Sequence, residues 1–158
     1  MNARQKQLVS DYLNGIAKLG EAVQGMTLEQ LHSRPIKDKW TTMELVCHLA
    51  DFEPVFADRM KRVIALEQPM LLGADENQFA RHLAYQDRNI TEEIALINLV
   101  RSQMARILNS IPEDFWLKTG VHSEKGPLSL ENLLEKAVGH MDHHLPFIAE
   151  KRRAFPNK

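Results

Sequence analysis

The 158-residue sequence has a single cysteine, Cys47, and lacks any long apolar run. One cysteine excludes an internal disulfide and is typical of proteins from reducing compartments. None of the apolar stretches reaches the roughly 20 residues that cross a bilayer. The N-terminal residues include Arg4 and Lys6 but no apolar segment of a signal peptide. We therefore expect a cytoplasmic protein that has no association with a membrane.

The sequence also lacks an excess of positive charge, because its 20 basic and 21 acidic residues give a net charge of −1. Proteins that bind nucleic acid usually present a basic surface, so the sequence predicts no nucleic-acid partner. The basic cluster at residues 151–153 suits the C-terminus of a helix. The length is that of one domain, which we place at residues 1–158.

Apolar residues at spacings of three and four predict four long amphipathic helices. The predicted helices cover residues from about 4–25, 41–68, 89–112 and 129–153. Thr41 and Glu44 form a capping box that starts the second helix, and Pro54 inside it predicts a kink. Either Val100 or Arg101 occupies the inner face of the third helix. No stretch alternates like a strand, so the sequence predicts an all-α four-helix bundle.

Residues 69–90 form a long connection between the second and third predicted helices, with a short helix near residues 78–84. Extended, this connection covers roughly 65 Å at about 3.3 Å per residue, against about 40 Å for the preceding helix. It can therefore return along the bundle as a crossover, which makes these two helices parallel. Residues 112–128 form another linker, in which Phe115 and Trp116 are predicted to cover one end of the bundle.

Three histidines fall between residues 140 and 144 of the fourth predicted helix. Measured from the apolar face at 100° per residue, His144 lies about 40–50° away and His140 about 80–90° away on the same side. His143 lies about 140–150° away and is predicted to face solvent. His140 and His144 therefore project together at the edge of the core, where two imidazoles can bind one ion.

His48 is the predicted third ligand, because it lies about 60° from the apolar face of the second helix. Cys47 points nearly the opposite way, which disfavours a site of two histidines and one cysteine. The levels of the histidines along their helices agree best if the second and fourth helices are antiparallel. Three histidines with open positions are typical of a catalytic divalent metal, because structural zinc normally has four protein ligands.

Simpler interpretations of these residues stay open. A single histidine at the edge of the core, such as His48, usually makes an ordinary hydrogen bond. HxxxH pairs also occur by chance on helix surfaces. The combination of three histidines at the core margins of two long helices is what favours a metal site. Asp51 and Asp142 are candidates to accept hydrogen bonds from the ligands, or else are solvated carboxylates.

Two segments resemble the DinB/YfiT-like superfamily of four-helix bundles. Residues 39–51, KWTTMELVCHLAD, are similar to the family pattern W-[ST]-x-x-E-x-x-x-H-[LI]. Residues 126–129, GPLS, and residues 140–148, HMDHHLPFI, form the second match. The resemblance places the family's metal-binding histidine on His48 and its HxxxH pair on His140 and His144.

The resemblance also implies an up-down-down-up bundle, a homodimer, and a bound divalent metal ion, with zinc expected and nickel or another ion as alternatives. The family includes bacillithiol-using thiol S-transferases, mycothiol-dependent isomerases and proteins named as metal-dependent hydrolases. We therefore expect a metal-dependent thiol S-transferase whose partners are a small-molecule thiol and a small electrophilic substrate.

Two other functions stay open, namely a metal-dependent hydrolase and a non-catalytic, metal-stabilised binding or stress-response module. In an enzyme, the 69–90 connection with Tyr85 or Arg88 is expected to shape the substrate pocket. No glutamate stands between His140 and His144, which disfavours the peptidase chemistry of HExxH motifs. The sequence identifies no catalytic residue beyond the three predicted ligands.

Overall fold

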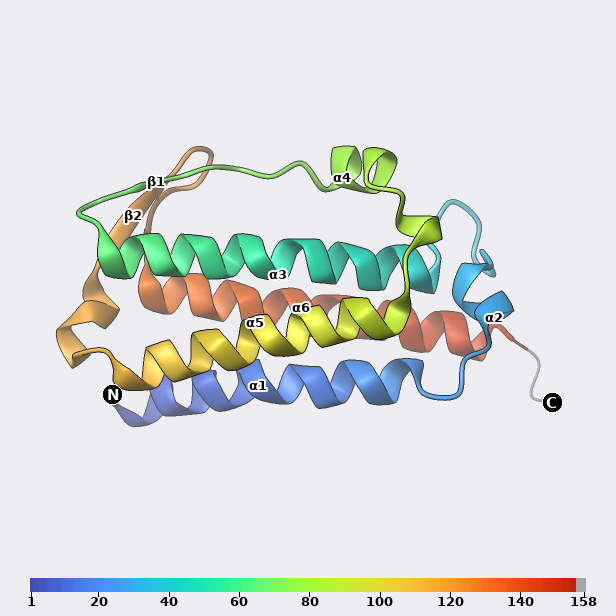
Figure 1. The fold of residues 1–158 in the computed structure, drawn as a ribbon, viewed down its shortest axis with the longest axis horizontal. Helices are drawn as coiled ribbons and strands as arrows, with labels where there is room; N and C mark the ends of the chain where they lie inside the picture. Colours follow the sequence, from blue (N-terminus) through green and yellow to red (C-terminus); the bar gives the residue numbers. More distant parts are fainter. Residues whose placement is uncertain (156–158) are drawn as a thin grey trace.

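The computed structural model describes residues 1–155, and four long helices dominate it (Figure 1). These are α1 (Ala3–Val23), α3 (Thr42–Ala65), α5 (Ile90–Ser110) and α6 (Leu130–Arg153). Two shorter helices, α2 (Leu28–His32) and α4 (Glu76–His82), lie in the connections, together with 3₁₀ turns at Tyr85–Asp87 and Glu113–Leu117. The four predicted long helices are confirmed. Among the described residues, no helix is long and apolar enough to cross a membrane.

Side-chain caps fix where the helices that carry the histidines begin. The Thr41 hydroxyl accepts a hydrogen bond from the Glu44 amide at 3.0 Å, and the Glu44 carboxylate accepts one from the Thr41 amide at 2.7 Å. Ser129 and Asn132 form the same box at the start of α6. Each box satisfies two backbone donors that a helix start leaves unpaired. Pro54 lies inside α3 without ending it.

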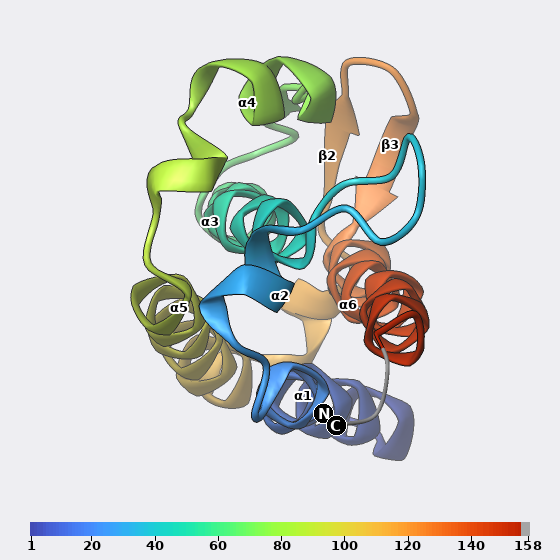
Figure 2. The same ribbon diagram turned by 90° about the vertical axis from the view of Figure 1, so that its right-hand side faces the viewer.

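Seen from the end, the four long helices form a square in which α3 neighbours α5 and α6, and α1 neighbours the same two helices (Figure 2). In Figure 1 the chain runs from left to right in α1 and α6, and from right to left in α3 and α5. The connection after α3 returns along the outside of that helix before α5 begins (Figure 1). This path puts α4 on the outer surface of the bundle, above α3.

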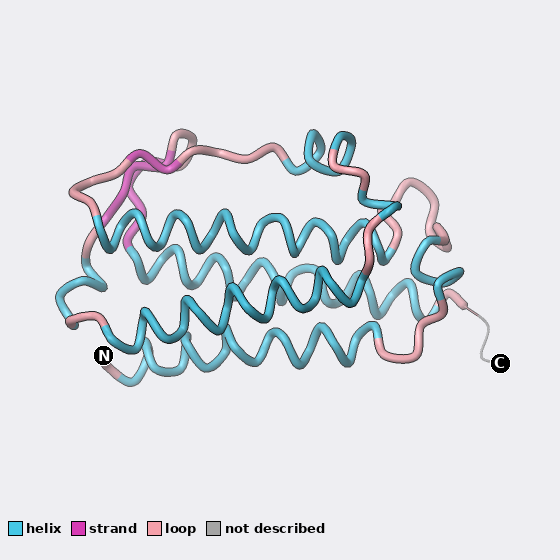
Figure 3. Tube along the Cα trace, viewed as in Figure 1, coloured by secondary structure: helices cyan, strands magenta, loops and turns pink. Residues whose placement is uncertain are grey.

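The prediction that the chain contains no strands is wrong, because a small sheet joins the two long connections (Figure 3). Strand β1 (Met70–Leu71) pairs in parallel with β2 (Thr119–His122), and β2 pairs with β3 (Gly126–Ser129) in an antiparallel hairpin. The strands are too short to show an alternating pattern, which hid them in the sequence. A Cβ on Gly120 would approach the Pro69 carbonyl to 2.9 Å, so glycine permits this close pairing.

The core is apolar along most of its length but contains the fully buried cation Arg101. Of the two candidates for the inner face of α5, Arg101 is fully buried and Val100 is half-buried. Trp116 is buried beneath the end of the bundle, as predicted, whereas Phe115 is half-buried. The guanidinium of Arg101 pairs with Glu53 of α3 and donates to the Tyr12 carbonyl of α1.

Candidate metal centre

The structure brings His48 of α3 together with His140 and His144 of α6, the three residues predicted as ligands. One ring nitrogen from each lies within 4.8 Å of those from the other two. The Nε2 atoms of His48 and His140 are 2.8 Å apart, and each pair of the three rings has centroids 4.8 Å apart. His143 is exposed and packs its ring edge against Phe147, as its helical phase predicted.

Aromatic side chains surround the cluster and limit its contact with water. The ring centroid of Trp40 lies 5.1 Å from that of His48, and the ring centroid of Phe52 lies 4.5 Å from it. Phe56 packs 5.4 Å from His140. His48 is fully buried, whereas His140 and His144 are half-buried. The cluster is therefore largely dry and still reachable from outside.

Burial keeps all three imidazoles neutral near pH 7. It lowers the pKa of His48 and of His140 to about 3, and the nearby imidazoles lower both pKa values further. Burial lowers the pKa of His144 to about 4, with smaller contributions from His143 and Lys151. A neutral imidazole has a free electron pair, which is the form that binds a metal ion.

Two ring nitrogens of the cluster have no partner among the described residues. Nδ1 of His48 and Nδ1 of His144 are buried and have no hydrogen-bond partner among residues 1–155. An unpaired buried polar atom costs about 1–3 kcal/mol, so a native protein rarely leaves two together without a reason. Two nitrogens that share one zinc ion at about 2.0–2.1 Å are at most about 4.2 Å apart.

The two acidic residues considered as hydrogen-bond acceptors for the ligands are engaged elsewhere. Asp51 accepts from Arg88 of the connection, with Oδ1 and Nη1 2.8 Å apart. Asp142 forms an exposed ion pair with Lys18 of α1, with 2.9 Å between Oδ1 and Nζ. Neither carboxylate therefore orients a histidine of the cluster, and the interpretation of Asp142 as a solvated surface residue fits the structure.

The part of the 69–90 connection that reaches the cluster is not the one predicted. Tyr85 is buried, and its carbonyl accepts a hydrogen bond from the thiol of Cys47. Arg88 is held by Asp51 and Glu93. Tyr85 and Arg88 thus anchor the connection on the outer side of α3, away from the two cavities that reach the histidines.

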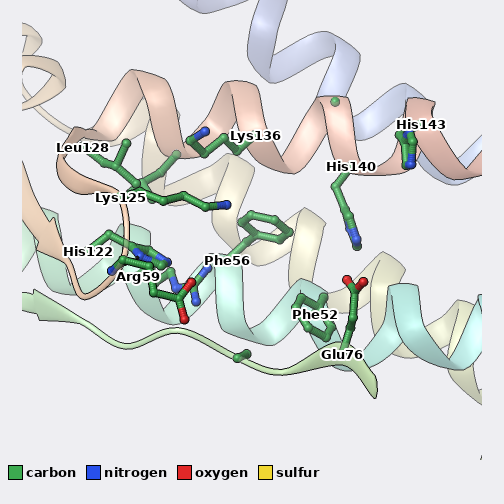
Figure 4. A pocket seen from close by; sticks show the side chains of 14 residues that line it. Phe52, Phe56, Arg59, Glu76, His122, Lys125, Leu128, Lys136, His140 and His143 are labelled. Atoms are coloured by element: carbon green, nitrogen blue, oxygen red, sulfur yellow. Dashed lines mark hydrogen bonds between the residues drawn. The ribbon is translucent and has the colours of Figure 1, made fainter. Parts of the chain in front are cut away.

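Two cavities reach the cluster, one at His140 and the other at His144. The larger, of about 400 Å³, includes His140, Phe52 and Phe56 in its wall (Figure 4). The smaller, of about 270 Å³, includes His144 in its wall. Glu76, the first residue of α4, lines both, and Figure 4 shows its carboxylate turned toward His140. The histidines are therefore accessible to small molecules, and Glu76 is the carboxylate common to both cavities.

Sequence reasoning missed Glu76 and the polar residues at the far end of the larger cavity. Nothing local marks Glu76, since its position depends on how the connection crosses the bundle. Arg59 follows His48 by 11 residues, which returns it to within about 20° of the same helix face. Lys136 precedes His140 by four residues and shares its side of α6. The helical phase that selected the histidines could therefore have identified both cations.

The fold and the site together define a helical-bundle protein with a three-histidine cluster between two of its long helices. The model of the DinB superfamily matches residues 14–148, and the chain belongs to this superfamily. The resemblance read from the two sequence segments is therefore confirmed.

Among its relatives, the chain is 29% identical over 139 residues to YfiT of Bacillus subtilis (strain 168), named as a candidate metal-dependent hydrolase, with 87% of this chain and 78% of that protein covered. It is 25% identical over 133 residues to OB0413 of Oceanobacillus iheyensis, which has a name of the same kind, with 83% of this chain and 75% of that protein covered.

A solved structure of YfiT from Bacillus subtilis, described as having an unusual four-helix bundle topology, superposes with a TM-score of 0.89. The match covers 97% of this chain and 89% of that one at 24% identity, and it shows a common fold.

Proposed function

We propose that the chain binds a divalent metal ion through His48, His140 and His144 and acts as a metal-dependent enzyme on a small molecule. The observation that carries this proposal is the cluster of three neutral imidazoles, which aromatic rings surround and two cavities reach. The names of the relatives, which describe candidate metal-dependent hydrolases, support it. Zinc is the proposed ion, with nickel as an alternative, because imidazole suits both.

Three protein ligands leave room for an exogenous one, as is typical of catalytic sites. A bound divalent ion supplies Lewis acidity, which lowers the pKa of a water or thiol at its open position. The histidines hold the ion, Phe52 and Trp40 keep bulk water from the rings, and Glu76 is placed to accept a proton from the nucleophile.

Two candidate reactions differ in whether the nucleophile is a thiol or water. In the thiol S-transferase, which we predict from the resemblance, a small thiol attacks a small electrophile and Glu76 is dispensable once the thiolate has formed. In the hydrolase, water attacks and needs a base, so the position of Glu76 favours this second reaction. The non-catalytic module remains a third candidate, in which the ion only links α3 to α6.

The deciding experiment starts with metal analysis of protein purified without a histidine tag. The metal-loaded protein is then tested for thiol consumption with a small electrophile and for ester hydrolysis, beside the Glu76→Gln variant and the exposed control Glu92→Gln. Hydrolysis lost only in Glu76→Gln supports the hydrolase, and thiol consumption retained in both variants supports the transferase. Metal-dependent stability without turnover supports the module. Absence of stoichiometric metal binding contradicts all three.

From the chain directions visible in Figure 1, we propose that the four long helices run up-down-down-up. The homodimer expected from the family stays a prediction, which sedimentation equilibrium would test. The cytoplasmic location also stays a prediction.

A further inference from the structure

The larger cavity has a chemical asymmetry that the proposed metal site does not explain. One end of it is formed by His140 and Phe52 (Figure 4). The other end gathers the basic side chains Arg59, His122, Lys125 and Lys136 (Figure 4). Glu124 is the acidic residue that lines this basic end, so positive charge prevails there.

Arg59 is the buried member of this group, with 8% of its surface exposed. Its Nη2 donates to the carbonyl of Leu72, which fixes the guanidinium between α3 and the connection. Its Nε has no hydrogen-bond partner, and no carboxylate pairs with the group within residues 1–155. Burial lowers the pKa of Arg59, and the Glu124 carboxylate opposes this only in part. A buried guanidinium that no carboxylate contacts directly is energetically unfavourable, so this geometry suits an anion supplied from outside.

His122 adds a neutral donor at the same end. It is 4% exposed, and its Nδ1 accepts a hydrogen bond from the backbone amide of Glu124 at 3.2 Å. A neutral ring that accepts at Nδ1 has its proton on Nε2, which is then a hydrogen-bond donor. Burial and the charges of Arg59 and Lys125 lower the pKa of His122. This end of the cavity is therefore lined by donors.

The spacing of the lining residues along α3 and α6 sets the length of a ligand that touches both ends of the cavity. His48 and Arg59 are 11 residues apart on α3, which is roughly 16 Å along the axis. Lys136 and His140 are four residues apart on α6, or roughly 6 Å. Phe56 lies between the two ends (Figure 4). The volume of about 400 Å³ is in the range of small-molecule sites, so one molecule can touch both ends.

We propose that the substrate of this site is a small molecule with a carboxylate or phosphate group, which binds at Arg59, His122, Lys125 and Lys136 while its reacting group faces His140. This inference rests on the proposed function, because it assigns the reacting end to the metal site. Charge-assisted hydrogen bonds from arginine and lysine bind carboxylate and phosphate oxygens strongly. The apolar middle of the cavity accommodates the uncharged part of the molecule.

The test uses metal-free protein, so that the anion site is observed apart from the ion. Inorganic phosphate, succinate and the uncharged analogue succinamide are titrated at constant ionic strength, and backbone amide NMR signals of residues 120–126 are followed. We expect phosphate, succinate or both to shift these signals with saturation, and succinamide to leave them unchanged. Which anion binds more tightly separates a phosphate substrate from a carboxylate substrate.

The variants Lys125→Glu and Lys136→Ala, both at exposed positions, should weaken anion binding by about tenfold or more, since each removes a charge-assisted contact. Lys6→Glu of α1 makes the same charge change as Lys125→Glu far from the cavity and should bind like the wild type. No saturable shift with either anion, or equal affinity in Lys125→Glu and the wild type, would overturn the proposal.

The proposed function fails in a different experiment. His140→Ala should lose the metal ion and keep the anion site, whereas Lys125→Glu should lose the anion and keep the metal. Anion binding in a protein that takes up no metal would therefore refute the metal site and leave an anion-binding cavity. Metal binding without anion binding would refute this inference alone.

Discussion

Arg101 of α5 and Glu53 of α3 form an ion pair at the centre of the bundle, with Nη2 and Oε2 2.7 Å apart and both side chains almost fully buried. The same guanidinium donates to the Tyr12 carbonyl at 2.7 Å and contacts the Ala137 carbonyl at 3.4 Å. The Tyr12 hydroxyl donates to Glu53. These contacts connect all four long helices, and Ala137 is one turn before His140.

Replacing Glu53 with Gln should destabilise the protein by about 3–5 kcal/mol, because it leaves the Arg101 charge buried without a partner. Urea denaturation followed by circular dichroism measures the change in the free energy of unfolding. The exposed pair of Arg62 and Asp58 on α3 provides the control, and Asp58→Asn should cost less than about 1 kcal/mol. Equal effects of the two substitutions would contradict a structural role for the buried pair.

Alanine substitution at two glycines of α1 should change the free energy of unfolding in opposite directions. A Cβ on Gly15 would lie 2.3 Å from Nη1 of Arg101, whereas one on Gly20 would meet no atom within 4 Å. Gly20→Ala should therefore raise the free energy of unfolding by about 0.5–1 kcal/mol through helix propensity alone. Gly15→Ala should lower it, because the guanidinium cannot move without losing its buried partners. Thermal unfolding of both variants measures the signs, and a stabilising Gly15→Ala would show that Arg101 can rearrange.

The histidines of α6 offer a matched pair for metal binding, since His143 and His144 are neighbours and only His144 belongs to the cluster. His144→Ala should abolish the rise in melting temperature on adding a slight excess of zinc over chelator-treated protein, and His143→Ala should preserve it. An ion present at 100 times its dissociation constant contributes about 2.7 kcal/mol, so the difference is measurable. A zinc-dependent shift of the same size in both variants would exclude His144 as a ligand.

The metal-free protein should lose stability as the pH falls from about 6.5 towards 4. The pKa values of His48, His140 and His144 lie well below the ordinary 6.5 in the folded chain. In that window the unfolded chain binds protons that the folded chain does not, so acid favours unfolding. Above about pH 7 this contribution is constant. Urea midpoints measured across pH in the presence of a chelator test it, and His48→Phe should flatten the profile. A profile that is flat in the wild type would contradict buried, neutral imidazoles.

Cys47 should be unreactive in the native protein. Burial raises the pKa of its thiol to about 12, and the Sγ atom lies 3.5 Å from the carbonyl of Tyr85. Because the thiolate is the reactive form, iodoacetamide should modify Cys47 at pH 8 only after denaturation in guanidinium chloride. Mass spectrometry of native and denatured samples gives the comparison. Rapid labelling of the folded protein would mean that the connection over α3 opens readily.

The sequence predicted the parts of this molecule that depend on local periodicity. Helix ranges, the cap at Thr41 and the phases of His48, His140 and His144 all follow from spacing along single helices. The sheet was missed because β1 has two residues, Met70 and Leu71, which pair with Val121 and His122, 51 positions later. Glu76 was missed for a related reason, since its place beside His140 depends on the path of a connection. Residues whose role depends on pairing between distant segments leave no periodic signal.

Position along the chain gives the histidine cluster one further property. His48 is separated from His140 by 92 positions, so the three nitrogens are close together only when α3 has docked against α6. An unfolded chain would offer the ion at most the two histidines of α6. The fraction of the protein that binds metal tightly would then equal the folded fraction. Apparent metal affinity should therefore decrease in any sufficiently destabilised variant, Gly15→Ala included, even where no ligand has changed. Bound metal measured as a function of denaturant concentration would report the folding equilibrium directly.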